Sequence, residues 1–368
     1  MTEFTKLAAP GVRGLQPYQP GKPIEELERE LGIANAVKLA SNENPLGPSP
    51  LAVEAGRKAM ANIALYPDGN GFGLKQKLSE RLGVPMERIT LGNGSSDILE
   101  FVVRAFVQPG DEVLFSEHAF AIYPILAMAA SAKPISVPAK DWGHDLVGMA
   151  AAITPDTKVV FVANPNNPTG TWLQSEELQA FIAKVPAETV VVVDEAYFEY
   201  GRHLASDYAD GMAWIDDYPN LVVSRTFSKC HGLAGLRIGY GVSHPGVADL
   251  LNRVRPPFNV NSIALAAAEA ALSDAAHLSR TLEVNAEGME QLVADFDALG
   301  LSYIESIGNF ISVNVGREAG PVYEGLLREG VIVRPIAGYG MPDHLRITIG
   351  TPEQNTRVIA ALKQVLGR

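Results

Sequence analysis

The sequence has a single cysteine, Cys230, among its 368 residues, so no disulfide can form within the chain. It also lacks an uninterrupted apolar run of the roughly twenty residues that a membrane helix requires. The opening stretch, MTEFTKLAAPGVRGL, has no apolar core of the kind found in secretory signals. These absences predict a cytoplasmic protein that spans no membrane.

Basic residues are in the minority, because 30 lysines and arginines face 42 aspartates and glutamates and leave a net charge of −12. A strongly acidic balance disfavours binding to the phosphate backbone of nucleic acids. The hydrophobic fraction of 47% and the charged fraction of 20% are typical of a globular protein whose length suits two domains. We therefore expect small-molecule ligands rather than nucleic acid or membrane.

Three segments follow one another along the chain. Residues 1–35 form an expected N-terminal arm that contains the amphipathic helix IEELERELG. Residues 36–256 alternate short apolar runs with helical patterns, which predicts an α/β domain with a mostly parallel central sheet covered on both faces. Residues 257–368 begin with a long helical stretch, 262–299, and then mix strands with helices, which predicts a smaller α+β domain.

One glycine-rich segment is a candidate phosphate site. LGNGSSD, residues 91–97, leaves a predicted strand and opens a helix, with Ser95 or Ser96 expected as the N-cap. Bare N–H groups and the positive end of the helix dipole suit a phosphate there, although an ordinary strand-to-helix turn has the same composition. The full GxGxxG spacing is absent, and GNGFG at 69–73 has no strand before it and is interpreted as a loop.

Further polar groups follow other predicted strands, and such groups gather at one edge of an open α/β sheet. VANPNNPTG places Asn164, Asn166 and Asn167 after one strand, where Asx–Pro turns are also common. Asp194 directly follows four valines, so an ionised carboxylate there needs a cation or a strong hydrogen-bond donor. Lys229 lies just past the strand LVVS, within TFSKCHGLAGLRIG; a solvated loop lysine is the alternative.

Together these groups match one cofactor. A nucleophilic lysine, a carboxylate that can pair with a ring nitrogen, and a phosphate site are the protein groups that pyridoxal 5'-phosphate chemistry uses.

The motifs and their order also resemble a known family. LASNENPLGPSP, YPDGNG, LGNGSSD, NPNNPTG, DEAY, TFSKCHGLAGLRIG and HLRITIG resemble those of fold-type I, class II aminotransferases that depend on pyridoxal 5'-phosphate. Within that group the chain is similar to histidinol-phosphate aminotransferases over almost its whole length. The resemblance implies the fold-type I architecture, a large domain with a smaller C-terminal domain, and a homodimer.

The resemblance implies roles at the cofactor. Lys229 is expected to hold pyridoxal 5'-phosphate covalently and to move protons, and Asp194 to pair with the ring nitrogen. Tyr197 and Asn167 are expected to hydrogen-bond its phenolic oxygen, which makes Lys229, Asp194 and Tyr197 the expected catalytic residues. The expected phosphate ligands are Gly94, Ser95, Ser96, Ser228 and Arg237.

Position 120 departs from the pattern of many relatives, which stack a tyrosine on the cofactor ring where this chain has Phe120. The aromatic face needed for stacking is kept, but a hydroxyl contact is lost, and Tyr123 is the candidate substitute.

For the substrate, the resemblance implies Arg334 and Arg346 together with Asn167, with Tyr18 from the arm and Tyr66 from the neighbouring subunit. Tyr66 is also expected to reach the neighbour's cofactor. The implied reaction, a step of histidine biosynthesis, is reversible transamination between L-histidinol phosphate and 2-oxoglutarate, giving imidazole acetol phosphate and L-glutamate.

Four other functions remain open at this point. An aminotransferase for phenylalanine or tyrosine, or a lyase such as threonine-phosphate decarboxylase, would use the same scaffold. A nucleotide-dependent oxidoreductase is a further alternative, but that function gives Lys229 and Asp194 no role. A regulator that binds pyridoxal 5'-phosphate would need a DNA-binding module, for which the chain has neither the length nor the charge.

Two further features are given structural interpretations. Cys230 is expected to fill space next to the lysine, since nothing nearby requires a thiolate. The histidines at 118, 231 and 344 are too scattered to predict a metal site.

Overall fold

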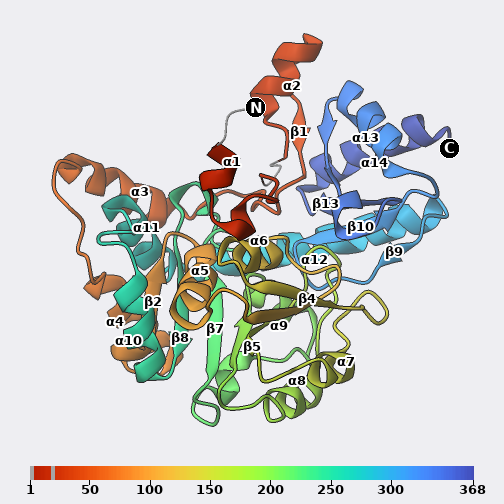
Figure 1. Ribbon diagram of the computed structural model, residues 1–368. Coiled ribbons are helices and arrows are strands. Elements are labelled where there is room, and N and C mark those ends of the chain that lie inside the picture. The colour runs from red at the N-terminus through yellow and green to blue at the C-terminus, as the bar shows by residue number, and fades with distance from the viewer. Residues whose placement is uncertain (1–3, 18–20) are drawn as a thin grey trace.

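A seven-stranded sheet forms the centre of the larger part of the molecule in the computed structural model, which describes residues 4–17 and 21–368 (Figure 1). Its strands in spatial order are β2 (Ile89–Gly92), β8 (Gly239–Ser243), β7 (Leu221–Thr226), β6 (Val190–Asp194), β5 (Thr157–Ala163), β3 (Glu112–Ser116) and β4 (Lys133–Val137). The pairs from β4 to β7 are parallel, and β8 runs antiparallel to β7 and β2. The predicted α/β class with a mostly parallel sheet is confirmed.

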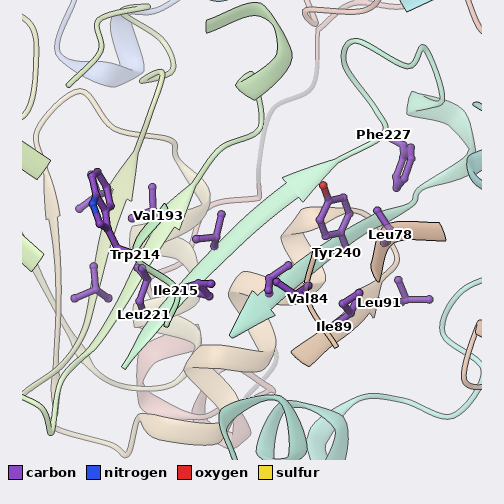
Figure 2. Packing of buried hydrophobic residues seen from close by; sticks show 14 of the residues in the cluster. Leu78, Val84, Ile89, Leu91, Val193, Trp214, Ile215, Leu221, Phe227 and Tyr240 are labelled. Atoms are coloured by element: carbon purple, nitrogen blue, oxygen red, sulfur yellow. The ribbon is translucent and has the colours of Figure 1, made fainter. Parts of the chain in front are cut away.

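The central strands are apolar at nearly every position because both faces of the sheet are covered. On β5, Val159 and Phe161 pack into one hydrophobic cluster, whereas Val160 and Val162 pack into the cluster on the opposite face. Figure 2 shows part of the second cluster, which includes Val193 of β6 and Trp214. The prediction of central strands buried on both sides is confirmed.

Helices cover both faces of this sheet. One face packs against α5 (Ser95–Phe106), α6 (Ile122–Ala129) and α10 (Pro245–Val254). Helices that pack on the other face include α3 (Pro50–Ala59), α4 (Phe72–Leu82), α7 (Leu146–Ala151), α8 (Ser175–Ile182) and α11 (Ser262–Ala271). Shorter elements around the sheet are α9 (Phe198–Leu204) and the 3-10 turns Met60–Asn62, Met86–Arg88, Gly211–Trp214 and Ala234–Leu236.

The C-terminal part, blue in Figure 1, has its own sheet and core. Its four-stranded antiparallel sheet is ordered β12 (Arg334–Pro335), β13 (His344–Thr348), β10 (Phe310–Asn314) and β9 (Tyr303–Ile304). The surrounding elements are α12 (Ala275–Ala298), α13 (Ala319–Arg328), α14 (Pro352–Leu366), the short strand β11 (Val331–Ile332) and the 3-10 turn Ala337–Tyr339.

The predicted helical stretch 262–299 is divided into α11 and α12. The division occurs where the side chain of Asp274 accepts a hydrogen bond from the His277 N–H and caps the start of α12. Alanines of α11 pack into the hydrophobic cluster of the seven-stranded sheet, whereas α12 contributes Leu292 and Phe296 to the C-terminal core. The domain boundary predicted at 256 stays a proposal; α11, although it follows that position, packs on the seven-stranded sheet.

The N-terminal segment runs beside both parts of the molecule (Figure 1). It contains α1 (Phe4–Leu7), the 3-10 turn Pro10–Val12, α2 (Ile24–Leu31) and β1 (Val37–Lys38), which pairs in parallel with β11. The predicted helix in IEELERELG is confirmed as α2, and it ends at Gly32, whose φ of 64° is left-handed. Among the described residues, no helix has both the length and the apolar character needed to cross a membrane.

Candidate active site

A cavity of about 430 Å³ opens at the carboxyl ends of β5, β6 and β7, where it also meets the start of α5 and the strands β12 and β13. Residues from both domains therefore line one space. The predicted site residues along it are Ser95, Ser96, Phe120, Asn167, Asp194, Tyr197, Ser228, Lys229, Arg237, Arg334 and Arg346. A larger hollow of about 720 Å³ lies elsewhere, around Trp142 and Trp172, and contains none of them.

Lys229 projects from the loop after β7 into the middle of this cavity. Its Nζ donates a hydrogen bond to the carbonyl of Ser41 at 3.0 Å and lies 5.7 Å from the centre of the Tyr197 ring. Burial, reinforced by the positive charge of Arg346, lowers the pKa of Lys229 to about 7. A large share of the amine is therefore neutral near neutral pH, which is the form that attacks a carbonyl.

Asp194 ends β6, and the parallel register places Ser224 of β7 directly beside it. Ser224 Oγ donates to Asp194 Oδ1 at 2.9 Å, and Tyr123 Oη donates to Oδ2 at 2.9 Å. Burial raises the pKa of Asp194, while these two hydrogen bonds act in the opposite direction. The predicted strong donor for this carboxylate is thus present, as two hydroxyl groups.

Tyr123 directs its hydroxyl to Asp194, and its role as a substitute for the hydroxyl missing at position 120 stays a prediction. It is fully buried on α6, with its ring stacked on Phe161 at a centroid distance of 4.6 Å, and its hydroxyl is engaged by Asp194. Phe120 lines the cavity and meets the Tyr123 ring edge-on at 6.0 Å. Stacking of Phe120 on a cofactor stays a prediction.

The start of α5 forms an open cradle. Gly94 is the N-cap, with φ of 89°, so the prediction of Ser95 or Ser96 as the N-cap is wrong. The left-handed conformation favours glycine at the entry to the helix, and both serines therefore fall in its first turn, on the cavity. Similarly, GNGFG is a loop only to Gly71, because α4 begins at Phe72.

The cradle also needs glycine for space. A Cβ atom on Gly94 would lie 2.2 Å from Nη2 of Arg237, and one on Gly239 would lie 2.4 Å from the backbone N of Ser95. Arg237 in turn donates to Ser228 Oγ at 3.2 Å. Backbone N–H groups, a hydroxyl and a guanidinium therefore converge on one point, an arrangement that suits a phosphate.

Tyr197 and Asn167 also line the cavity. Asn42 Nδ2 donates to Tyr197 Oη at 2.8 Å, and Arg346 Nη1 donates to Asn167 Oδ1. Burial raises the pKa of Tyr197 to about 12, so its hydroxyl remains a donor at neutral pH. Asn42 was missed at the sequence level, although it belongs to the LASNENP motif; its φ of 56° and full burial mark it only once the structure is known.

The two predicted substrate arginines lie side by side. Arg334 of β12 and Arg346 of β13 are register partners, and both line the cavity. Arg346 is 6% exposed, donates to the carbonyl of Ala40 at 2.8 Å, and lies 5.4 Å from the centre of the Phe310 ring. Their contact with a substrate stays a prediction.

Of the predicted site residues that the structure describes, Gly94 and Tyr66 are not among those that line this cavity. Tyr66 is 82% exposed and stacks on Phe258 with centroids 4.7 Å apart. Tyr18 lies outside the described residues. Cys230 is fully buried against Tyr197 and Tyr200, which fits the space-filling role predicted for it. Within residues 4–17 and 21–368, no three His, Cys, Asp or Glu side chains are grouped so as to hold a metal ion.

Comparisons with known proteins agree with this geometry. The family model for class I and II aminotransferases matches residues 34–362. Histidinol-phosphate aminotransferase 1 of Nitrosococcus oceani is 59% identical over 99% of this chain and 98% of its own length. Histidinol-phosphate aminotransferase 2 of Pseudomonas fluorescens is 60% identical over 100% of this chain and 99% of its own.

A solved structure is similar as well. The crystal structure of histidinol-phosphate aminotransferase from Sinorhizobium meliloti in complex with pyridoxal-5'-phosphate has a TM-score of 0.89 with this chain. It is 31% identical in sequence, and the match covers 97% of each chain.

Proposed function

The chain belongs to the class I and II aminotransferase family, and we propose that it transfers the amino group of L-histidinol phosphate to 2-oxoglutarate. The products are imidazole acetol phosphate and L-glutamate, and the step belongs to histidine biosynthesis. One observation carries this proposal: a single cavity joins Lys229 and Asp194 to the paired arginines Arg334 and Arg346.

The enzyme depends on pyridoxal 5'-phosphate, and the residues of the cavity fit that group. The glycine-lined cradle at the start of α5 supplies donors for a phosphate, and the carboxylate of Asp194 can face a ring nitrogen. Lys229 lines the same cavity and would supply the amine. The three groups match the three ends of the cofactor in charge and in hydrogen-bonding capacity.

When bound, the cofactor captures amines through its aldehyde, and its protonated ring withdraws electrons from the bond that loses a proton. Lys229 Nζ, neutral in part because of its burial, would hold the cofactor and would then take the proton from the amino-bearing carbon of the substrate. Asp194 would pair with the ring nitrogen. Tyr197, positioned by Asn42, would donate a hydrogen bond to the phenolic oxygen.

The arginine pair accounts for two substrates at one site. L-Histidinol phosphate carries a phosphate near its amino carbon, and 2-oxoglutarate carries carboxylates. The planar guanidinium of Arg346 offers two parallel donors to either anion, and Arg334 adds charge from the adjacent strand. Both half-reactions can therefore use the same cationic end of the cavity.

The proposal includes a homodimer in the cytoplasm. Tyr66 projects into solvent while its ring is held by Phe258, and other large apolar side chains nearby are exposed, such as Ile63, Leu65 and Phe72. A second copy of the chain would cover this surface and receive Tyr66 at its own active site. The cytoplasmic location is proposed because the chain has a single cysteine, Cys230, and proteins of reducing compartments do not depend on disulfides.

The test is a panel of amino donors assayed with 2-oxoglutarate on the protein loaded with pyridoxal 5'-phosphate. L-Histidinol phosphate is expected to give the highest kcat/KM, above phenylalanine and tyrosine. Equal or higher kcat/KM for the aromatic amino acids would assign the chain to aromatic transamination instead. Release of carbon dioxide without transfer to the keto acid would assign it to a decarboxylase.

A further inference from the structure

We propose that Tyr123 is a positioning residue that acts through Asp194, keeping this carboxylate unprotonated so that the bound cofactor retains the proton on its ring nitrogen. The inference rests on the proposed function, because the ring nitrogen belongs to the cofactor. It concerns a residue outside the expected catalytic set of Lys229, Asp194 and Tyr197.

The first support is that both oxygens of Asp194 accept hydrogen bonds from neutral hydroxyls. Tyr123 donates to Oδ2 and Ser224 donates to Oδ1, each at 2.9 Å. Neutral donors stabilise the anion without cancelling its charge, which an arginine or lysine partner would do. The negative charge therefore stays available to the cavity that Asp194 lines.

The second support is that Tyr123 cannot turn away from the carboxylate. Its side chain is fully buried, and its ring lies nearly parallel to that of Phe161, with an interplanar angle of 5°. The ring of Phe120 packs against the Tyr123 ring in a T-shaped arrangement. A phenol packed on these aromatic faces has one direction for its hydroxyl, and that direction ends at Oδ2 of Asp194.

Other titratable groups near Asp194 have different hydrogen-bond partners. Burial, and to a smaller degree Asp194, raises the pKa of Tyr197, another nearby ionisable side chain, and its hydroxyl is engaged by Asn42. Glu195, the next residue, is bound to Arg225 and to the Gly211 N–H. Tyr123 itself remains a donor across the working range, since burial and Asp194 raise its pKa well above the usual value.

Removal of the Tyr123 hydroxyl has a predictable direction. Oδ2 would lose its donor in a buried environment, so the carboxyl would bind a proton more tightly. The proton shared with the ring nitrogen would then move toward Asp194, and the ring would withdraw electrons less strongly. Less positive charge on the ring also raises the proton affinity of the nitrogen that joins Lys229 to the cofactor.

The experiment compares the wild-type protein with Tyr123→Phe, both loaded with pyridoxal 5'-phosphate. The pH midpoint of the visible absorbance is expected to rise by roughly one unit in the variant, a tenfold change in proton binding. The kcat with L-histidinol phosphate is expected to fall about tenfold while KM stays within about twofold, because no substrate contact is removed.

Tyr208→Phe is the matched control. Tyr208 is another buried tyrosine, and its hydroxyl donates to the Asn164 carbonyl at 2.7 Å instead of to a carboxylate. This variant is expected to leave the midpoint and kcat at wild-type values. A midpoint shift of equal size in Tyr208→Phe would overturn the proposal, since any lost buried hydrogen bond would then have the same effect.

Ser224→Ala keeps the proposal falsifiable if Tyr123→Phe does not fold. It removes the donor to Oδ1 and is expected to raise the midpoint in the same direction. An unchanged midpoint in either variant would contradict a role for the hydroxyls at Asp194. A wild-type protein that takes up no pyridoxal 5'-phosphate would instead overturn the proposed function, and this inference with it.

Discussion

The two ends of the cavity are built in different ways. At the proposed cofactor end, Lys229, Asp194 and the cradle at Gly94 all follow strands of one sheet or begin a helix packed on it. At the proposed substrate end, Arg334 and Arg346 come from the C-terminal sheet. The remaining proposed parts are the N-terminal arm and a second copy of the chain.

This difference separates two tasks. The cofactor end has donors and acceptors that already satisfy one another, as in the bonds of Asp194 to Ser224 and Tyr123. Such preorganised polar groups cost little rearrangement when they bind their ligand. The proposed substrate end has two adjacent arginines, Arg334 and Arg346, which would bind either a phosphate or a carboxylate. Changes at the first end should affect cofactor chemistry, and changes at the second should affect KM.

The largest effect is expected for Lys229→Ala. Activity should fall by roughly four orders of magnitude, because the amine that holds the cofactor and moves the proton is gone. Mass spectrometry after borohydride reduction should find no cofactor attached to the variant. Lys75→Ala is the matched control, since burial also lowers the pKa of Lys75, to about 8, outside the cavity. Cofactor still attached covalently to Lys229→Ala would contradict the role proposed for Lys229 at the cofactor end.

A change at the opposite end, Arg346→Lys, should raise the KM for L-histidinol phosphate by about thirtyfold. Lysine keeps the charge but loses the two parallel donors of the guanidinium, which are worth about 2 kcal/mol at a buried site. Steady-state kinetics measure the KM of the variant, and a cofactor titration measures its affinity for pyridoxal 5'-phosphate. Arg253→Lys, on an exposed ion pair with Asp249, should change neither quantity. Weakened cofactor binding with an unchanged KM would mean that Arg346 contacts the cofactor and not the substrate.

Gly94→Ala should weaken cofactor binding by about tenfold, because the added methyl group would displace Arg237 from the cradle. Gly83→Ala is the control for a positive φ without the steric clash: Gly83 has a φ of 70°, with open space around its Cβ position. That control should lose about 1 kcal/mol of stability and keep its cofactor affinity. Equal affinity losses in both variants would show that strain alone explains Gly94.

The smallest effect is a pH dependence at the cofactor end. The amine of Lys229 has a pKa of about 7, lowered by burial, so its neutral share grows as pH rises through that value. The rate at which cofactor-free protein captures pyridoxal 5'-phosphate should therefore fall about threefold between pH 7.5 and 6.5. Stopped-flow absorbance measures it. A rate that is constant over this range would mean that the amine is not the titrating group.

Sequence patterns revealed the cofactor end more completely than the substrate end. Lys229 and Asp194 follow buried strands, and the apolar runs LVVS and VVVV are enough to predict those strands. No such local pattern marks Arg334 and Arg346, whose positions in the site were predicted from the family resemblance. The roles of Tyr66 and Tyr18 stay predictions. The position of a residue relative to its strand is a local property, whereas the meeting of two domains is not.

Other features could not be predicted because they are contacts between distant side chains. Tyr123 meets Asp194 across 71 positions of the chain, and Asn42 meets Tyr197 across 155. Their partners depend on the register of strands and on which helix covers them. The N-cap was misplaced for a related reason: the serines have good capping side chains, but the space beside Arg237 required glycine at 94.

The half-reaction with L-histidinol phosphate alone tests both ends of the cavity at once. The protein loaded with pyridoxal 5'-phosphate is mixed with this amine in the absence of any keto acid, and the visible absorbance is followed. The account predicts that the visible band disappears in proportion to the amine added and returns when 2-oxoglutarate is supplied. A band that persists with L-histidinol phosphate, or that disappears only with phenylalanine or tyrosine, would contradict it.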